Sequence, residues 1–434
     1  MELTARQTLA RTILLTRQQR LPDVDEEMLI QMLAGTTVAI VADEENVITP
    51  SAQAAITTLV SLTAACGVQI RLVMPEVPVA GYQPPLFGKS LVAGLHDLAA
   101  DVVAGAAAVV DEKTRRGDVA FVIGSTPWNG EADNAWRLAA DDWCGSMLPV
   151  RTSAKPISAR LPLGSLAAAT AASAEPYRTA LRRLVAATGC QVTEIGLLRP
   201  APELTIRLAP SGTPSSDFGL RALDLVSAGA LSSAVLHVLL RVQGLDAAVR
   251  LWEPQDAEGS NLNRYALLRR SMLPITKVEM LTRWAHGSIS IAGFAKLVDE
   301  EVVKSLKDWA PWVFVGADTV EARWLVQRAW PRHLVVAGTA GFMAMASEHD
   351  RERPCAGCLH PASNPAGPDI ATISFVSYLG GLLGASRLLR WSVAGPAPAG
   401  EQMTEAYADR LDSPTGYRSG PVTRLRDCPV GCGS

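Results

Sequence analysis

Short apolar runs alternate with helical segments of small and apolar residues along the first part of the chain. Residues 38–41 and 68–73 are rich in β-branched and aliphatic side chains and predict two strands, with a helix over 51–65 between them. Residues 119–123 predict a further strand, which ends at Gly124. Strands that alternate with helices in this way are typical of an α/β protein with parallel sheets.

The second part of the chain shows the same alternation. Residues 248–252 and 312–315 predict buried strands, and a small-residue turn at 227–233 enters an apolar helix before the first of them. A helix predicted over 163–184 begins with a glycine-containing segment at 163–167. This segment is echoed at 380–385, which leads into a helix predicted over 385–391. We therefore predict a divergent internal repeat of two Rossmann-like units. The two units are expected to span residues 1–205 and 206–434, with 191–214 as the connection.

Charge and apolarity narrow the choice of partners. The formal net charge of −3 offers no basic stripe for nucleic acid. The apolar stretch 375–391 contains Arg387 and Arg390, which favours a core helix over a membrane span. Arginines at positions 6, 11 and 17 interrupt the first apolar positions, so no signal peptide is expected. These patterns predict a cytoplasmic protein that binds neither nucleic acid nor membrane.

Polar side chains suited to phosphate binding follow the predicted strands of the second unit. The turn that contains Gly229 and Ser232 leads into a helix, so backbone N–H groups can approach a phosphate. Glu253 ends the next strand, where an acid suits a ribose hydroxyl. Downstream side chains that can bind phosphoryl oxygens or magnesium are Asn261, Asn263, Arg264, Lys277 and Asp318.

Together these residues indicate chemistry on ATP. The alternative is an ordinary dinucleotide site, but hydride transfer does not need the run Asn-Leu-Asn-Arg at 261–264. For Asp318 alone, the alternative role is a helix N-cap ahead of Thr319. Arg323, further along the same predicted helix, is either a second cation of the site or an outward-facing arginine.

The order of these residues resembles the adenylating domain of the ubiquitin-activating, ThiF/MoeB-like superfamily over about residues 206–434. The resemblance implies that Asp318 holds magnesium, that Arg264 and Lys277 contact the phosphates, and that Asn261 orients phosphate or magnesium. Glu253 would hold the ribose. Two of three family glycines in the loop are serine here, and Glu253 and Gln255 replace the usual pair of aspartates.

The first unit lacks the residues that carry this resemblance. Its loop at 42–46 reads Ala-Asp-Glu-Glu-Asn, without glycine and with acids that would repel phosphate. The resemblance therefore implies a pseudo-dimer of an inactive and an active unit. In such enzymes an arginine of an N-terminal helix enters the opposite nucleotide site, and Arg6 and Arg17 are the candidates here. A solvated helix face is the alternative for each of them.

Four of the seven cysteines have the spacing of a metal site. Cys355 and Cys358 form one knuckle, and Cys428 and Cys432 form another with one extra residue, Gly431. Thiolates at such spacing suit one tetrahedral structural zinc, and the glycine can supply a permissive backbone angle. The alternative is four unrelated thiols in a reducing cytoplasm. The remaining three, Cys66, Cys144 and Cys190, have the apolar surroundings of packing residues.

The implied reaction is adenylation of the C-terminal carboxylate of a ubiquitin-like protein, as in a bacterial activating enzyme. Relatives then pass the acyl group to a cysteine on the crossover segment, which here spans 359–374 and contains no cysteine. The family nucleophile would fall at 369–372. The options are direct transfer, an oxyester on Thr372 or Ser374 assisted by His360, or a cysteine from elsewhere.

Two other functions remain open at this point. One is a peptide-adenylating enzyme of a ribosomal natural-product pathway, because the same domain serves there. The other is a non-catalytic module that recognises a peptide tail, which the serines in the phosphate loop would favour. The expected partners are a ubiquitin-like protein or peptide C-terminus and, for the first reading, a conjugating enzyme.

Overall fold

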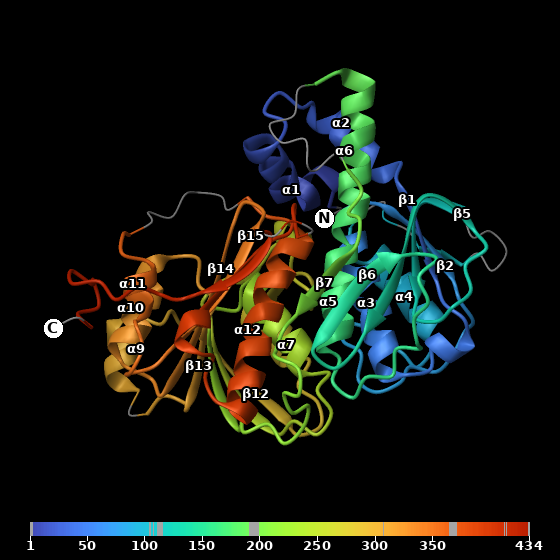
Figure 1. Ribbon diagram of the computed structural model, residues 1–434. Coiled ribbons are helices and arrows are strands. Elements are labelled where there is room, and N and C mark those ends of the chain that lie inside the picture. The colour runs from blue at the N-terminus through green and yellow to red at the C-terminus, as the bar shows by residue number, and fades with distance from the viewer. Residues whose placement is uncertain are drawn as a thin grey trace.

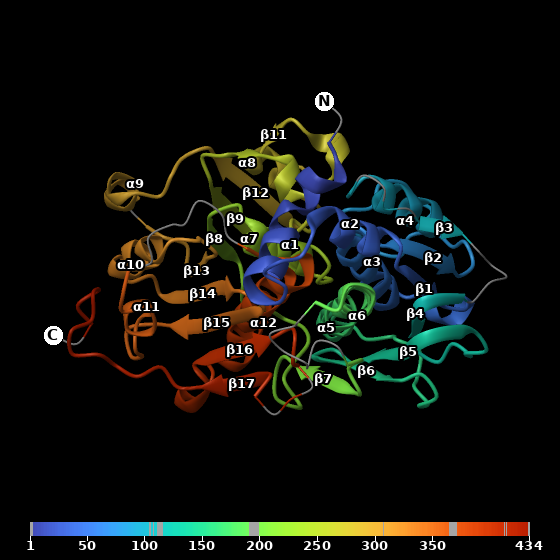
Figure 2. The ribbon, with the colours of Figure 1, turned by 90° about the horizontal axis from the view of Figure 1, so that it is seen from above.

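Two β-sheets lie side by side with helices between them in a computed structural model of the chain (Figures 1 and 2). The structure describes residues 3–103, 106, 108–110, 116–190, 199–306, 308–363, 371–411, 413 and 415–432. The first half of the chain forms one sheet and the second half forms the other. The mixed α/β class predicted from the alternation of strands and helices is therefore confirmed.

The first sheet has seven strands in the order β3-β2-β1-β4-β5-β6-β7. The first five strands in this order are parallel, and β6 and β7 are antiparallel to their neighbours. The strands are β1 (Thr37–Val41), β2 (Gln69–Val73), β3 (Ala108–Val110), β4 (Arg116–Ile123), β5 (Glu131–Ala140), β6 (Cys144–Pro149) and β7 (Leu204–Arg207).

The second sheet has eight strands in the order β12-β9-β8-β13-β14-β15-β16-β17. Five parallel strands are again followed by antiparallel ones, so the two sheets share one strand order, with β17 added at the second edge. The strands are β8 (Ala222–Val226), β9 (Ala247–Trp252), β12 (Ile289–Phe294), β13 (Trp312–Val315), β14 (His333–Ala340), β15 (Met343–His349), β16 (Met403–Tyr407) and β17 (Tyr417–Gly420). A separate hairpin pairs β10 (Asp256–Ala257) with β11 (Ile275–Thr276).

The helices between the sheets carry small side chains that allow close packing. In α3 and α5 of the first half nearly every position is buried, and alanine, serine and threonine predominate. In α12 of the second half, Gly381 lies so close to α7 that an added Cβ would come within 2.4 Å of the Ala234 Cβ. These inner helices are α3 (Pro50–Ala64), α5 (Leu163–Ala172), α7 (Ala230–Leu239) and α12 (Ser374–Ala394).

The remaining helices lie around this centre. In Figure 2, α1 crosses above the junction of the halves, and α9, α10 and α11 cover the far side of the second sheet. The helices are α1 (Ala5–Gln19), α2 (Glu26–Ala34), α4 (Leu91–Ala100), α6 (Ala174–Thr188), α8 (Lys277–Thr282), α9 (Glu300–Ser305), α10 (Val320–Arg328) and α11 (Ala356–Leu359). The short 3-10 segments are η1 (Glu44–Asn46), η3 (Gly259–Asn261), η4 (Arg270–Met272) and η5 (Ala399–Glu401).

Several predicted boundaries differ from the structure. The helix predicted over 163–184 is two helices that meet at Ser173. The glycines at 380–384 lie inside α12 rather than before a helix at 385–391. Strand β7 crosses the predicted boundary between the units and belongs to the first sheet. The predicted connection 191–214 is only partly covered, because its first eight residues lie outside the described residues.

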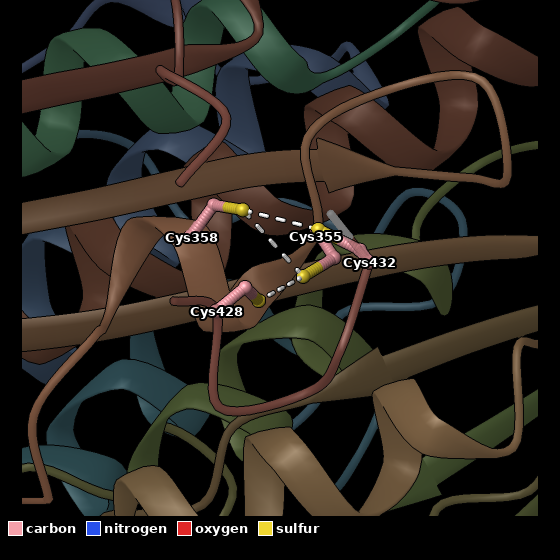
Figure 3. Close-up of side chains that lie close together, drawn as sticks. All are labelled: Cys355, Cys358, Cys428 and Cys432. Carbon is pink, nitrogen blue, oxygen red and sulfur yellow. Dashed lines mark hydrogen bonds between the residues drawn. The ribbon is translucent and has the colours of Figure 1, made fainter. Parts of the chain in front are cut away.

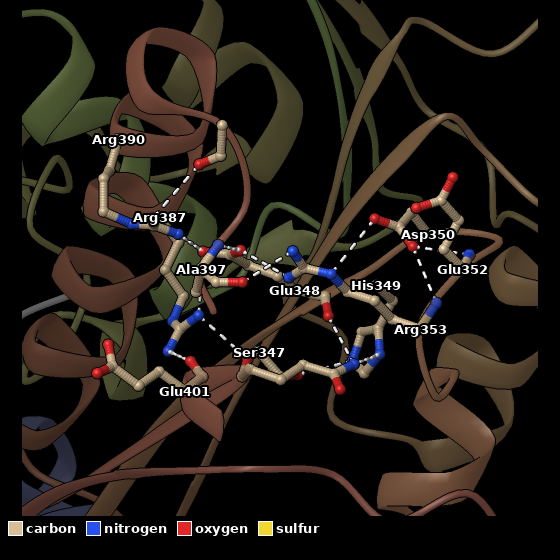
Figure 4. Close-up of polar contacts among 12 residues, drawn as sticks. Ser347, Glu348, His349, Asp350, Glu352, Arg353, Arg387, Arg390, Ala397 and Glu401 are labelled. Carbon is tan, nitrogen blue, oxygen red and sulfur yellow. Dashed lines mark hydrogen bonds and ion pairs between the residues drawn. The ribbon is translucent and has the colours of Figure 1, made fainter. Parts of the chain in front are cut away.

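The two arginines that interrupt the apolar stretch of α12 pair with one buried acid (Figure 4). The Oε1 atom of Glu348 accepts from Arg390 Nη2 and lies 3.0 Å from Arg387 Nη1, and its Oε2 atom lies 3.2 Å from Arg353 Nη1. The Ala397 backbone N–H donates to the same carboxylate. This cluster ties α12 to the end of β15. Among the described helices, none has the length and apolarity needed to cross a membrane.

Candidate functional site

The loop after β8 is hydrogen-bonded to the acid at the end of β9. Glu253 Oε2 accepts hydrogen bonds from the Ala228 backbone N–H at 3.1 Å and from Ser227 Oγ at 3.3 Å. Ser227 has φ of 81°, a conformation in which a non-glycine residue is strained. Ser227 Oγ also accepts from the Gly229 N–H at 3.1 Å. These bonds position the chain immediately before the N-terminus of α7.

The first turn of α7 has an unusual buried hydroxyl. Ser232 is fully buried, and its Oγ has no hydrogen-bond partner among the described residues. An added Cβ on Gly316, at the end of β13, would lie 3.2 Å from this oxygen. The glycine therefore lets the two strand-end loops approach each other. Gly229 and Ser232 thus stand at the helix N-terminus where the sequence places a phosphate.

Some side chains of the run at 261–264 stabilise the fold, and one lies at the candidate site. Asn261 Oδ1 accepts from the Glu258 N–H at 3.0 Å and so closes the short η3 segment. Asn263 is fully buried, and its Nδ2 donates to Thr12 Oγ1 of α1 at 3.1 Å. Arg264 is half-buried and donates to Ser260 O and, at 2.9 Å, to Asn263 Oδ1. The guanidinium is therefore held at the edge of the loop.

Lys277 lies in the same group of charges. Its Nζ donates to Gln255 Oε1 at 2.5 Å, and its side chain is largely buried. Burial lowers the pKa of Lys277, while the nearby Glu253 carboxylate opposes this shift and Arg264 adds to it. Asp318 also raises this pKa, so the acid at the end of β13 is close enough to act on the lysine.

Asp318 and Arg323 occupy the start of α10. The N-cap residue is Thr319, so the alternative that Asp318 is the N-cap is wrong. Asp318 is exposed, whereas Arg323 is buried and donates to Ala317 O at 3.2 Å. Burial lowers the pKa of Arg323 to about 10, with Asp318 opposing the shift. Arg323 therefore faces the protein interior rather than the solvent.

One aromatic residue of the candidate site was not predicted from the sequence. Tyr265 follows the run at 261–264, and burial raises its pKa to about 12. The Arg264 charge opposes that shift, and Glu253 and Asp318 add to it. The hydroxyl lies 3.9 Å from the point where a Cβ on Gly229 would stand. Its position directly after the motif is the sequence signal that could have found it.

The corresponding loop in the first half is closed by a side chain. Asn46 Nδ2 donates to Asp43 Oδ1 and Ser125 Oγ, and its Oδ1 accepts from the Ser125 N–H at 3.1 Å. A Cβ on Gly124 would lie 2.0 Å from Asn46 Oδ1, so the asparagine fills the space beside the strand end. Asp43 bonds Thr126 as well. This network therefore occupies the loop that corresponds to the candidate phosphate loop of the second half.

The two candidate arginines of α1 face α2. Arg6 Nη2 lies 2.7 Å from Glu26 Oε2, and Arg17 Nη1 lies 2.8 Å from Glu26 Oε1. By contrast, Thr12 of the same helix contacts the second half through Asn263. Either arginine would have to leave its ion pair to reach the nucleotide, so that role stays a prediction.

The candidate oxyester residues are buried. Thr372 Oγ1 lies 2.9 Å from Ser377 Oγ. Ser374 Oγ donates to Leu62 O at 2.9 Å and lies 3.4 Å from the Cys66 thiol. His360 Nε2 instead lies 2.9 Å from Arg323 Nη1, and burial lowers the pKa of His360 to about 3. Positions 369 and 370, where the family nucleophile was expected, lie outside the described residues.

The four cysteines of the predicted zinc site converge from two segments (Figure 3). Their sulfur atoms all lie within 4.8 Å of one another. The Sγ–Sγ distances are 3.8 Å for Cys355–Cys358 and 3.2 Å for both Cys355–Cys428 and Cys358–Cys432. Tetrahedral zinc with Zn–S bonds of about 2.3 Å needs sulfurs roughly 3.8 Å apart. Gly431 has φ of 81°, which accommodates the extra residue of the second knuckle.

The surroundings of the cysteines also suit a metal. The Leu425 N–H donates to Cys358 Sγ at 3.4 Å, the kind of outer contact that orients a thiolate. Cys355 is fully buried beside Val422 and Met403. The four residues therefore fit one structural zinc, which would tie the C-terminal segment to α11.

Comparison with known proteins gives distant likenesses. A family model described as the BilD N-terminal domain matches residues 37–195, well under half of the chain. No curated protein matches.

Two similar solved structures are those of E. coli MccB with ATP and of the microcin C7 biosynthetic enzyme MccB in complex with N-formylated MccA. The first is 16% identical with a TM-score of 0.41 and covers 50% of this chain and 68% of MccB. The second is 17% identical with the same TM-score and covers 49% and 67%. Likenesses this distant decide nothing about activity.

Proposed function

We propose that the chain adenylates the C-terminal carboxylate of a peptide or small protein at the expense of ATP. The observation that carries the proposal is the convergence of Glu253, Arg264, Lys277 and Asp318 around the N-terminus of α7. These groups come from four separate segments, and the charges of the other three all act on the pKa of Lys277. The matching loop of the first half is filled by Asn46, so we assign the activity to the second half.

The reaction places two anions in contact. A carboxylate oxygen attacks the α-phosphorus of ATP, the bond from this phosphorus to the bridging oxygen breaks, and pyrophosphate leaves. Positioning and neutralisation of charge therefore provide most of the rate enhancement. Arg264 and Lys277 would neutralise the phosphates, and Glu253 would accept from the ribose hydroxyl. Magnesium held by Asp318 would supply further positive charge to the leaving pyrophosphate.

The two halves would form a pseudo-dimer, with an inactive adenylation-like unit beside the active one. The shared strand order of the two sheets supports this interpretation. The four cysteines would hold a structural zinc in the active unit. A ubiquitin-like protein is the first substrate candidate. After adenylation its acyl group would pass to a conjugating enzyme or directly to an acceptor. A peptide of a natural-product pathway is the second substrate candidate.

ATP–pyrophosphate exchange tests the reaction directly. Exchange should require a substrate with a free C-terminal carboxylate and should be lost when the same substrate carries a C-terminal amide. Small ubiquitin-like proteins and short peptides are tested in parallel, so the substrate class is read from the same assay. Binding of ATP and of a partner tail without any exchange would instead identify a non-catalytic recognition module.

A further inference from the structure

A cavity of about 270 Å³ lies between the two halves, at the end of α7 opposite Gly229. The first half contributes Ser51, Tyr82 and Gln83 to its walls, and the second half contributes Arg241, Gln243 and His286. Tyr82 and His286 stack with their ring centroids 3.9 Å apart. The cavity is therefore built by both halves and is distinct from the candidate nucleotide site.

A buried cation without a counter-charge lines this cavity. Arg241 is 6% exposed, and its guanidinium donates to the Gln83 side chain and to the backbone oxygens of His237 and Pro84. All three acceptors are neutral, and no described carboxylate forms an ion pair with this arginine. Burial lowers its pKa to about 10, which still leaves it charged at neutral pH. A buried charge of this kind is costly unless an anion compensates it.

The rest of the lining adds positive potential and no negative charge. No Asp or Glu is among the described lining residues, and the exposed Arg160 stands at the opening. Pro50 and Ser51 are the first residues of the 15-residue α3, so the positive end of that helix dipole faces the cavity. The guanidinium of Arg241 uses three of its five N–H groups in the bonds above, which leaves two for a ligand.

The position of the cavity matches that of the candidate site in the second half. It is lined by the start of α3, the loop after β2 and the residues before α5. The corresponding elements of the second half are the start of α7, the run at 261–264 and the residues before α12. The first half thus keeps a cavity at the equivalent place, although Asn46 closes its phosphate loop.

We infer that this cavity binds a small oxyanion, a phosphate or a carboxylate, between Arg241 and Arg160. The volume is below the range of about 300–1,000 Å³ typical of sites for drug-sized molecules, so a small anion fits better than a nucleotide. The anion would compensate the buried charge and join the two halves. This inference goes beyond the proposed adenylation and does not depend on it.

Titration calorimetry of the full chain at constant ionic strength tests the inference. The probes are inorganic phosphate and acetate, and the relative affinities report which oxyanion the cavity prefers. Arg160→Gln should weaken phosphate binding by about tenfold, because it removes one charge-assisted bond. Arg151→Gln is the matched control, since Arg151 is an exposed arginine outside the cavity. Lys277→Met controls for phosphate in the candidate nucleotide site.

The outcomes separate the two sites. Phosphate binding that is weakened by Arg160→Gln but not by Arg151→Gln or Lys277→Met supports the cavity. No saturable binding of either probe, equal affinities of Arg160→Gln and wild type, or loss only in Lys277→Met would overturn the inference. Arg241 would then be only a clamp that joins α7 to the first half.

Discussion

At the scale of single residues, the candidate site depends on side chains that hold one another in place before any ligand arrives. Glu253 organises the loop at Ala228, and Asn263 secures its own run against α1 through Thr12. Among the described residues of this site, Arg264, Lys277 and Asp318 are the charged groups suited to contact phosphate or magnesium. These three were predicted from the sequence, and Tyr265 lies directly after the run at 261–264. Thr12, by contrast, is brought to this run by folding from a position that carries no local signal.

Lys277 provides the sharpest test at this scale. Lys277→Met should lower ATP–pyrophosphate exchange by about 100-fold or more, because it removes a cation from the developing charge on the phosphates. Lys304→Met is the matched control, since Lys304 is an exposed lysine paired with Glu300 on α9. The measurement is the exchange rate at saturating ATP. Equal rates for the two variants would contradict the assigned role.

At the scale of elements, close approach of helices decides how the inner layer packs. The stretch 380–384 was predicted to precede a helix, but its glycines lie within α12, where they face α7, β13 and β14. The spacing of the glycines could not show whether they precede a helix or lie on its packed face, because glycine occurs in turns and also where two backbones approach closely. The packing partner, Ala234, became visible only in the fold.

Replacement of one of these glycines should destabilise the protein. In Gly381→Ala the new Cβ would lie 2.4 Å from the Ala234 Cβ and 2.6 Å from Leu231 O, so α12 would have to shift. Overpacking of this kind typically costs about 1–3 kcal/mol. Gly400→Ala is the control, because nothing lies within 4 Å of its added Cβ. Urea unfolding of both variants compares the free energies, and equal values would argue against tight packing here.

The cysteine cluster is a second prediction at the scale of elements. Cys355→Ser should abolish stoichiometric zinc and destabilise the chain by several kcal/mol, because structural zinc sites contribute on the order of 10 kcal/mol to folding. Cys190→Ser, which changes a cysteine outside the cluster, should leave both quantities unchanged. Metal content by mass spectrometry and the thermal unfolding midpoint are the measurements. Unchanged zinc in Cys355→Ser would refute the assignment.

At the scale of the whole molecule, buried histidines link stability to pH. Burial lowers the pKa of His349 to about 4 and that of His360 to about 3, and it also lowers the pKa of His237. Because the unfolded chain binds these protons near pH 6.5, the folded state loses stability as pH falls below that value. Well above pH 6.5, from about pH 8, all three are neutral in both states and the contribution is constant.

The size of this effect can be measured through one histidine. Between pH 6.5 and 5, His349 should account for a loss of roughly 1.5 kcal/mol, because the unfolded histidine takes up its proton over this range while the folded one stays neutral. His349→Gln should therefore flatten the dependence of unfolding free energy on pH. His96→Gln, at an exposed position, should keep the wild-type slope. If the slope of His349→Gln also matched wild type, another group would have to be responsible.

Local pattern determined the alternation of strands and helices, the strand-end acids, the run at 261–264 and the pairing of two cysteine knuckles. These features are encoded over a few neighbouring residues, so the sequence alone contains them. Only the tertiary structure decided that Asn46 closes the first loop, that Arg6 and Arg17 turn toward Glu26, and that a cavity forms around Arg241. Each of these depends on contacts between segments distant in the chain, and their geometry is set by packing rather than by local preference.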